Sequence, residues 1–590
     1  MKLRQKSSDR VVAAQTAENS SADRENAPVL NLATELRPRL GDVLLDQNLV
    51  SPDSLATALD LQQASGRRLG AILVESGLVD PNVLNAALAH HFGVETIDLR
   101  RVKPADDAVD LVPEDAARLH RVMPVSLEQD RLSIAVADPG DADMRAYLGT
   151  LPVGSIDVMM APLADITMAQ NTYYRIITAD DAAVQQFWAE SAPVVERLTA
   201  KDADAPVIQL VNRIIAQALR DRTSDVHIEP TDGRMRIRFR IDGALHEALS
   251  IPLSTGLELV SRLKVMAEMD IVERRRPQDG QFQTVVDGMS VDVRVATAST
   301  IWGETAVLRI LDKSRSLKQL GELGMPQESY DRYMNVLHKP YGMILCSGPT
   351  GSGKTTTLYA SLAQISRAEI NIMTIEDPVE YVFPSINQMQ ILPQAGITFV
   401  TGLKSILRQD PDVILLGEIR DQETARIATQ SALTGHVVMS SIHATDSCSA
   451  LFRLIDMGIE GFLVGSALVG VVGQRLVRRI CPSCRETYTP PRTELDWFER
   501  LGGEVEGTEF VRGAGCAFCS HTGFRERVGV YEVLEMNDDL SHMVVSGANP
   551  HEIRRTAESS GMRTMGQEGM LLVAQGITTV AEVIRNVHVH

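Results

Sequence analysis

The 590-residue chain has few cysteines and few aromatic residues, and both shortages limit what it can be. Six cysteines cannot supply a disulfide scaffold for a chain of this length. Four of them stand in two Cys-x-x-Cys pairs, an arrangement that indicates a metal site in a reducing compartment. Aromatic residues make up 4% of the chain, which does not favour a stacking platform for single-stranded nucleic acid.

Long apolar runs are also missing. No run reaches the roughly 18 residues that a membrane-spanning helix needs. The nearest, residues 461–473, is short and rich in glycine, so we predict a buried core helix there. The N-terminus has no apolar segment of the kind found in signal peptides. We therefore expect a cytoplasmic protein that reaches a membrane only through partners.

The size of the chain predicts about four domains, at roughly 150 residues each. Residues 1–35 mix charged and small residues without periodicity, so we predict a disordered tail. Residues 181–204 are rich in Ala and Asp and are predicted to contain a linker. The net charge of −19 argues against a general role in binding DNA or RNA.

The strongest motif is the glycine-rich loop Gly348-Pro-Thr-Gly-Ser-Gly-Lys354-Thr355. It fits the P-loop pattern, in which a glycine and four further residues precede Gly-Lys-Ser/Thr. The apolar residues 341–346 predict a buried strand before the loop, and residues 355–364 predict a helix after it. Strand, loop and helix is the order that the motif requires.

These loop residues predict a site for nucleotide phosphates. The glycines let backbone N–H groups turn inward, and the helix N-terminus adds partial positive charge. Lys354 is expected to reach the β- and γ-phosphates, and Thr355 to hold Mg²⁺. The predicted nucleotide-binding residues are Gly348, Pro349, Thr350, Gly351, Ser352, Gly353, Lys354, Thr355 and Thr356.

Three segments after the P-loop carry further polar residues at strand ends. A strand over residues 372–375 leads into Glu376-Asp-Pro-Val-Glu380, and an apolar strand over 412–416 leads into Gly417-Glu418. Carboxylates at this edge of a parallel sheet lie beside bound nucleotide. A further strand is flanked by His436 and His443, each of which is either a γ-phosphate sensor or a satisfied core histidine.

Residues 205–315 precede this core and predict an α/β domain with one basic strand face. Residues 206–220 are apolar at helical spacing, and arginine alternates with apolar residues over 234–241. Two later predicted strands carry Arg294 and Arg309. Such a face is either solvated surface or, next to a P-loop, a source of arginines for the nucleotide phosphates.

The four paired cysteines predict a structural zinc site, because four thiolates suit tetrahedral Zn²⁺ and leave no open position. A redox dithiol and unligated thiols are the alternatives. The remaining cysteines, Cys346 and Cys448, are expected to be buried small apolar residues. The predicted zinc ligands are Cys481, Cys484, Cys516 and Cys519.

An internal repeat occupies residues 36–95, where Arg39-Leu40-Gly41 recurs as Arg68-Leu69-Gly70. Each unit predicts a short helix, a turn and a longer helix, with Ser51 and Asp80 as N-caps. The repeat is either a structural scaffold or a ligand site whose arginines stack on a purine. Residues 96–180 predict a small α/β domain, with strands over 95–102, 132–136 and 156–160 and a helix over 113–119.

From Ser224 to His590 the motifs together resemble the GspE/PulE/PilB family of type II secretion and type IV pilus assembly ATPases. The repeat resembles the N-terminal domain of MshE-type ATPases, which binds cyclic di-GMP. That domain ends each unit with Gln, as at Gln62, whereas His91 stands in the second unit. The tentative cyclic di-GMP residues are Arg39, Leu40, Gly41, Arg68, Leu69 and Gly70. The small α/β domain resembles one that docks on membrane-anchored partners.

The resemblance implies an α/β multidomain protein with a RecA-like P-loop core and a zinc-binding subdomain. A PAS-like α/β domain would precede the core, after the repeat and the small α/β domain. The implied boundaries are 316–480 for the core, 481–525 for the zinc subdomain and 526–590 for a C-terminal helical region.

The resemblance also assigns roles in catalysis. Glu380 corresponds to the general base and Glu418 to the Walker B acid, with Lys354 on the phosphates and His443 at the end of its strand. Arg294 and Arg309 match the arginines that approach the phosphates. Arg408 and Lys404 stand where relatives carry further arginines, although a lysine lacks the bidentate fork.

These features predict a cytoplasmic homohexamer that hydrolyses Mg-ATP to power type II secretion or type IV pilus assembly. Its expected partners are an inner-membrane platform protein and a membrane-anchored docking protein, with no nucleic acid. The cysteine module favours assembly or secretion over fibre retraction. The alternatives are a nucleic-acid translocase with a RecA-like core and a regulatory scaffold that senses a cyclic dinucleotide.

Overall fold

The computed structural model describes residues 28–31, 40–47, 49–65, 69–79, 81–174, 206–286, 289–312 and 318–587. The chain divides into two units, one of residues 1–178 together with 516–521 and one of residues 179–515 together with 522–590. Most of the predicted tail, the predicted linker over 181–204 and the predicted N-cap Asp80 lie outside the described residues.

The helical repeat in the first unit has the predicted order of a short helix, a turn and a longer helix, repeated once. The Ser51 hydroxyl caps the second helix by accepting a 3.2 Å hydrogen bond from the Ser54 N–H. Buried side chains from all four helices form one core. The helices are α2 (Leu40–Asp46), α3 (Pro52–Ser65), α4 (Leu69–Glu75) and α5 (Pro81–Phe92).

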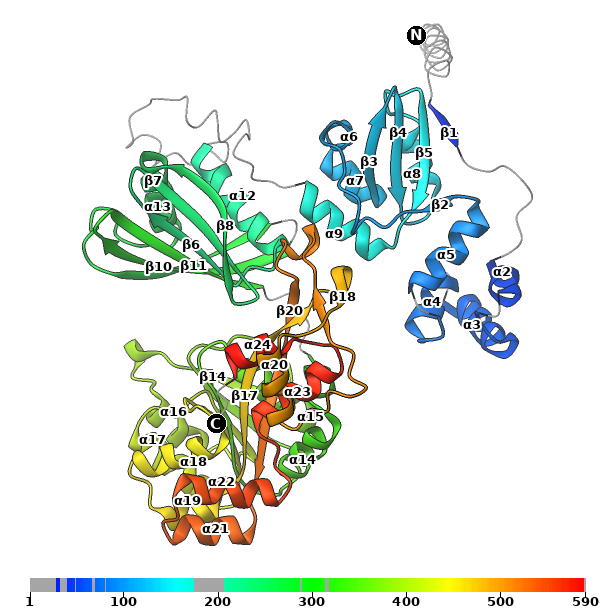
Figure 1. The fold of residues 1–590 in the computed structure, drawn as a ribbon. Helices are drawn as coiled ribbons and strands as arrows, with labels where there is room; N and C mark the ends of the chain where they lie inside the picture. The colour runs from blue at the N-terminus through cyan, green and yellow to red at the C-terminus, as the bar shows by residue number, and fades with distance from the viewer. Residues whose placement is uncertain are drawn as a thin grey trace, which may run out of the picture. The chain divides into compact units, whose positions relative to one another are not determined.

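A small α/β domain completes this unit, as predicted (Figure 1). Its sheet has the strand order β1-β5-β4-β3, with β2 pairing with β5. The elements are β1 (Val29–Asn31), β2 (Glu95–Thr96), α6 (Asp106–Leu111), α7 (Glu114–His120), β3 (Val122–Glu128), β4 (Arg131–Val136), α8 (Ala142–Leu148), β5 (Ser155–Met160) and α9 (Leu163–Tyr173).

Two predictions for this unit are wrong in extent. The strand predicted over 95–102 ends at Thr96, because the Asp98 carboxylate accepts a 3.1 Å hydrogen bond from the Arg100 N–H and the chain turns there. The disordered tail predicted over 1–35 includes strand β1, which pairs in parallel with β5. The three residues Val29–Asn31 form too short a pattern to predict a strand from the sequence.

The second unit begins with the arginine-bearing domain, an antiparallel six-stranded sheet with two helices. Its strand order is β8-β7-β6-β11-β10-β9. The predicted helix and the predicted basic strand occur at their predicted bounds as α12 and β7. The elements are α12 (Pro206–Arg220), β6 (Asp225–Pro230), β7 (Arg234–Ile241), β8 (Ala244–Pro252), α13 (Leu253–Met266), β9 (Gln278–Val286), β10 (Met289–Thr300) and β11 (Gly303–Asp312).

The core sheet follows, with the strand order β14-β13-β15-β16-β12-β17-β20. Its strands are parallel except β20, which runs antiparallel to β17. The elements up to β17 are α14 (Gln327–Leu337), β12 (Gly342–Ser347), α15 (Lys354–Ile365), β13 (Ile372–Glu376), β14 (Asn387–Gln390), α16 (Phe399–Ile406), β15 (Val413–Leu416), α17 (Gln422–Leu433), β16 (Val437–Ile442), α18 (Ser447–Asp456), α19 (Gly461–Ala467) and β17 (Leu468–Ile480).

Helices cover both faces of this sheet, so each face has its own buried core (Figure 1). Helices α14 and α15 pack on one face, and α16 to α19 pack on the other. The single helix predicted over 461–473 is wrong, since α19 ends at Ala467 and β17 starts at Leu468. A short apolar run fits a buried helix or a buried strand equally well, and the valines after Leu468 favour the strand.

The C-terminal part extends β17 and β20 beyond the core sheet and adds helices. Phe498 and Phe510 share a core with residues of α23 and α24. No described helix is long and apolar enough to cross a membrane. The elements are β18 (Arg485–Thr487), α20 (Arg492–Arg500), β19 (Val511–Gly513), β20 (Phe524–Glu535), α21 (Asp538–Val545), α22 (Pro550–Ser559), α23 (Met565–Ala574) and α24 (Val580–Asn586).

Candidate functional site

The P-loop connects the fully buried strand β12 to helix α15, as its sequence pattern predicts. Lys354 is the first residue of α15, and its ammonium donates 2.9 Å hydrogen bonds to the carbonyls of Gly348 and Pro349. Burial lowers the pKa of Lys354, with Cys346 and Glu418 acting in the opposite direction. The helix N-terminus and this lysine therefore place positive charge at one end of the loop.

Gln474 on β17 explains, through its side chain and its backbone, why two of the loop positions are glycine. Gly353 has a φ of 87°, and a Cβ there would lie 2.8 Å from Nε2 of Gln474. A Cβ on Gly348 would lie 2.6 Å from the carbonyl oxygen of the same residue. The loop thus packs directly on β17, and a larger residue at either position would displace it.

The acidic segment after β13 contains two glutamates with different environments. Glu376 is buried, and its carboxylate accepts hydrogen bonds from the hydroxyls of Tyr359 and Thr374 and, at 3.2 Å, from Gln388 Nε2. Because its acceptor sites are occupied, Glu376 is a structural anchor. Glu380 instead opens into the cleft that the P-loop lines.

The charge state of Glu380 depends on groups from two domains. Burial raises the pKa of the Glu380 carboxyl, and the positive charge of Arg294 lowers this pKa. Glu376 raises this pKa and Arg309 lowers it, both to a smaller extent. A carboxyl whose pKa lies above its ordinary value is a stronger proton acceptor once ionised, which suits a general base.

Glu418 follows β15 on the strand edge where the P-loop lies. Its carboxylate forms an ion pair with Arg420 and lies 3.8 Å from Nε2 of His443, which follows β16. His443 lines the cleft, as predicted for a residue beside the nucleotide.

Of the two alternatives left open for His436, the structure argues against the γ-phosphate sensor. Val437, its neighbour, pairs with Gly342 at the start of β12, whereas the P-loop follows the other end of that strand. The His436 ring lies 3.0 Å from the Ser431 carbonyl, at the opposite edge of the sheet. A parallel strand has its two ends at opposite edges, so only one of the two histidines can face the nucleotide.

The arginines of the preceding domain have distinct partners. Arg309 Nε donates a 3.1 Å hydrogen bond to Asp225, and Arg309 lines the cleft. Arg294 is its cross-strand neighbour and lines an adjoining hollow of about 460 Å³. On β7 both Arg236 and Arg238 form ion pairs with Glu229, so the charge of that part of the basic face is partly compensated.

The cleft occupies about 980 Å³ and has residues from both domains in its wall. Its wall includes every predicted phosphate-loop residue except Gly348, from Pro349 to Thr356, together with Glu380, Glu418, His443 and Arg309. Lys404 and Arg408 do not line it, and Lys404 forms a 2.7 Å ion pair with Glu423.

Several cleft residues were missed by the sequence reasoning. Arg475 is anchored by hydrogen bonds to the carbonyls of Gln474 (3.1 Å) and Thr445 (2.7 Å), and burial lowers its pKa. Arg420 and Tyr359 stand close to recognised motifs, two residues after Glu418 and four after Thr355. Spacing along a strand end or a helix face was the signal that could have identified them. Other missed cleft residues include Arg478, Arg527, Arg585 and Asn586, whereas Arg240 belongs to the basic strand face that the sequence predicted.

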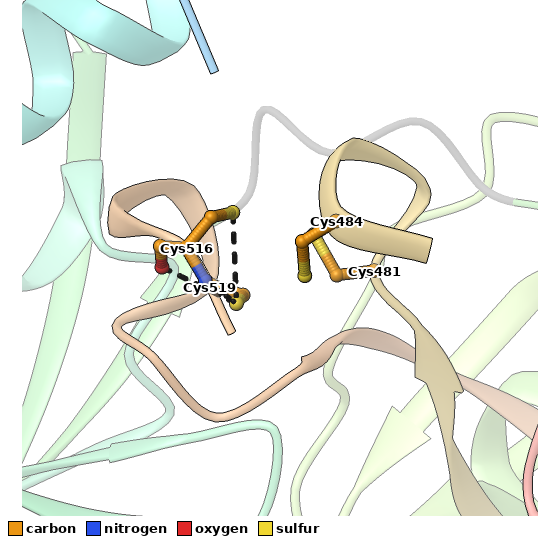
Figure 2. A group of neighbouring side chains, drawn as sticks. All are labelled: Cys481, Cys484, Cys516 and Cys519. Atoms are coloured by element: carbon orange, nitrogen blue, oxygen red, sulfur yellow. Dashed lines mark hydrogen bonds between the residues drawn. The ribbon is translucent and has the colours of Figure 1, made fainter. Parts of the chain in front are cut away.

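The four paired cysteines come together, as predicted, and Figure 2 shows the two pairs facing each other from two loops. Their sulfur atoms all lie within 4.8 Å of one another. The Cys516 and Cys519 sulfurs are 3.8 Å apart, close to the edge of about 3.8 Å for a tetrahedron with Zn–S bonds of roughly 2.3 Å. Sulfur–sulfur spacing and donor type therefore both fit a zinc ion.

Backbone donors also point at these sulfurs. The Gly515 N–H lies 3.3 Å from the Cys484 sulfur, and the Cys516 N–H lies 3.2 Å from the Cys519 sulfur. N–H groups in this position stabilise the thiolate form that a metal binds.

The tentative cyclic di-GMP residues stand at or next to the start of the short helices α2 and α4. Arg39 and Arg68 lie outside the described residues. Gly41 and Gly70 lie in the short helices of the repeat, where a Cβ would lie 3.3 Å and 3.1 Å from Leu55 and Leu84 respectively. Close packing of the repeat units accounts for both glycines.

Two family models match the sequence. Residues 200–585 match the type II/IV secretion system protein model, and residues 92–179 match the MshEN domain model. The first match covers more than half of the chain. The chain belongs to the type II/IV secretion system protein family. The MshEN match begins at residue 92, after most of the helical repeat.

Curated relatives extend over almost the whole chain. The type IV pilus assembly ATPase PilB of Myxococcus xanthus is 37% identical over 93% of this chain and 98% of its own length. The type II secretion system protein E of Xanthomonas campestris is also 37% identical, with the same two coverages. The Legionella pneumophila ATPase DotB is 19% identical, with a TM-score of 0.48 over 63% of this chain and 94% of that chain. The family match and the curated relatives confirm the secretion and pilus assembly family that the motifs predicted.

Proposed function

We propose that this chain hydrolyses Mg-ATP and that the reaction drives type II protein secretion or type IV pilus assembly. One observation is the main support for this proposal. The P-loop, the strand-end carboxylates Glu380 and Glu418, and Arg309 from the preceding domain all line a single cleft. The relatives named above are ATPases or proteins of such machines.

Each group in the cleft has a chemical task. The P-loop backbone and Lys354 bind the β- and γ-phosphates. Glu380 accepts the proton of the attacking water, since it lines the cleft, whereas the carboxylate of Glu376 is occupied by hydrogen bonds. Arg309 in the cleft wall and Arg294 in the adjoining hollow neutralise charge that develops on the transferred phosphoryl group.

Magnesium fits the oxygen donors at the start of α15 and after β15. Thr355 and Glu418, both in the cleft wall, would hold it directly or through water. The ion supplies charge neutralisation on the phosphate oxygens. The ion pair with Arg420 orients the Glu418 carboxylate, and His443 lies 3.8 Å from it.

Motion follows if nucleotide contacts differ before and after hydrolysis. The cleft wall includes residues from two domains, so losing the γ-phosphate removes contacts with the arginines and favours a different angle between these domains. We propose that a cytoplasmic homohexamer transmits this change to an inner-membrane platform protein, with a membrane-anchored protein docked on its N-terminal part.

Steady-state ATP hydrolysis by the purified full-length chain tests this proposal. We expect turnover that requires Mg²⁺ and that Lys354→Ala abolishes. Lys404→Ala is the matched control, because Lys404 is a surface lysine on α16 outside the cleft. No turnover with or without a membrane fraction that contains the platform protein would contradict the proposal.

A second candidate function is regulation by cyclic di-GMP, which the MshEN match over residues 92–179 favours. Calorimetry with the full chain tests it, with Arg39→Ala and Arg68→Ala as variants. Micromolar binding that both variants lose would support a site in the repeat. Binding that both variants retain would place the ligand elsewhere, and no binding would leave the repeat as a scaffold.

A further inference from the structure

Tyr359 forms a hydrogen-bonded bridge between helix α15 and the segment that carries Glu380. Its side chain is buried and comes from the helix that starts at Lys354. Its hydroxyl donates to the Glu376 carboxylate. The same oxygen accepts a 3.3 Å hydrogen bond from the backbone N–H of Glu380.

The direction of these hydrogen bonds is fixed by chemistry. Burial, and next the hydrogen bond to Glu376, raise the pKa of Tyr359, so the phenol keeps its proton. A phenol has one donor and can still accept. A phenylalanine could make neither bond, so the hydroxyl itself joins the two glutamates.

The loop around Glu380 contains no helix or strand and depends on a few such bonds. Other hydrogen bonds of this loop include Val379 N–H to Gln390 Oε1 at 3.2 Å, Phe383 N–H to Gln388 Oε1 at 2.7 Å and Gln388 Nε2 to the Tyr381 carbonyl at 3.0 Å. The Phe383 ring also stands edge-on to the Tyr359 ring, with centroids 5.3 Å apart. Of the ties named here, only the hydroxyl holds the Glu380 backbone itself.

The position of Tyr359 on α15 relates this bond to the bound phosphates. Thr355 and Tyr359 are four residues apart, so they lie on the same side of the helix one turn from each other. Both line the cleft. The first turn of α15 thus lies at the proposed phosphate site, and its second turn holds the loop that carries Glu380.

We propose that Tyr359 is a positioning residue, whose hydroxyl sets the Glu380 carboxylate at the correct distance from phosphates bound at the start of α15. The proposal rests on the proposed function, in which Glu380 is the general base. It predicts that the hydroxyl affects the hydrolytic step and leaves nucleotide affinity unchanged, because the two hydrogen bonds of the hydroxyl described above go to Glu376 and Glu380 and not to the phosphate loop.

The test is Tyr359→Phe in the full-length protein, with kcat and the dissociation constant for ATP measured separately. We expect kcat to fall by about 10- to 100-fold, since a small displacement of a catalytic group has effects of this order. The ATP dissociation constant should stay close to the wild-type value. Tyr333→Phe is the matched control, because this buried hydroxyl also bonds to α15, at Ser361 (2.7 Å), but lies outside the cleft.

A second background shows whether the hydroxyl acts through Glu380. In Glu380→Gln, the further change Tyr359→Phe should not lower the residual rate, because the group that it positions is gone. Two results would overturn the proposal: a Tyr359→Phe kcat equal to that of Tyr333→Phe, or a loss of ATP affinity that matches the loss of kcat. Wild-type turnover in Glu380→Gln alone would instead refute the base assignment, and the positioning proposal with it.

Discussion

The hydroxyl of Thr357 on α15 donates a 2.8 Å hydrogen bond to the side-chain oxygen of Gln474 on β17, directly behind the phosphate-binding loop. Both side chains are almost fully buried. The same oxygen accepts a longer bond from the Cys346 thiol at 3.5 Å. Strand β12, helix α15 and strand β17 are thereby joined at the point where the loop leaves the sheet.

We expect Gln474→Leu to lower the free energy of unfolding by about 1–3 kcal/mol, the usual cost of leaving buried donors without an acceptor. Urea denaturation of the full chain measures it. Thr357→Val removes the main donor, so the double variant should lose less than the sum of the two single variants. Fully additive losses would show that the pair does not interact.

The cysteine cluster makes a prediction about metal content. Purified protein should contain one zinc ion per chain, and Cys516→Ser should lower both the zinc content and the melting temperature, because structural zinc contributes to folding. Cys448→Ala removes another buried cysteine outside the cluster and should leave the zinc content unchanged. Equal zinc content in Cys516→Ser and wild type would contradict the assignment.

Glu568 on α23 predicts a pH dependence of stability. Burial raises the pKa of this carboxyl from 4.5 to about 7, while the Ser329 hydroxyl bond and Arg563 act against burial. The native state therefore holds this proton more tightly than the unfolded state. Its contribution to stability is complete below the unfolded pKa and is lost as the pH rises through about 7.

Glu568→Gln should remove this dependence. Between pH values of about 5 and 7, the stability of the variant relative to wild type should rise by roughly 1 kcal/mol per pH unit. Urea denaturation at several pH values measures this difference. The exposed Glu558 on α22 provides the control, and Glu558→Gln should show no such trend. A Glu568→Gln profile parallel to that of wild type would refute the prediction.

Local sequence patterns predicted the elements whose signals are local. The apolar spacing of α12 and the alternation of β7 both gave correct bounds, because each pattern repeats over several turns or residue pairs. The P-loop was recognisable because glycine, lysine and threonine are each required by its geometry. The prediction of one helix over residues 461–473 was wrong because a short apolar run is compatible with a buried helix and with a buried strand.

Other features depend on residues far apart in the chain. Strand β20 joins the core sheet by pairing with β17, and the long cysteine loop between them gives no sign of that pairing. The sequence predicted only a helix at Tyr359. Its hydrogen bonds to Glu376 and Glu380 depend on tertiary structure, which the local pattern does not show. The sequence could not decide between the two alternatives for His436, because that choice requires the direction of its strand relative to β12.

The central claim is that Glu380 activates water in an ATP-hydrolysing cleft, and the most direct test is single-turnover hydrolysis by Glu380→Gln. The amide keeps the shape of the side chain and removes the proton acceptor. We predict that the variant binds Mg-ATP with near wild-type affinity and that its hydrolysis rate falls at least about 100-fold. Hydrolysis at a rate close to wild type would contradict the account.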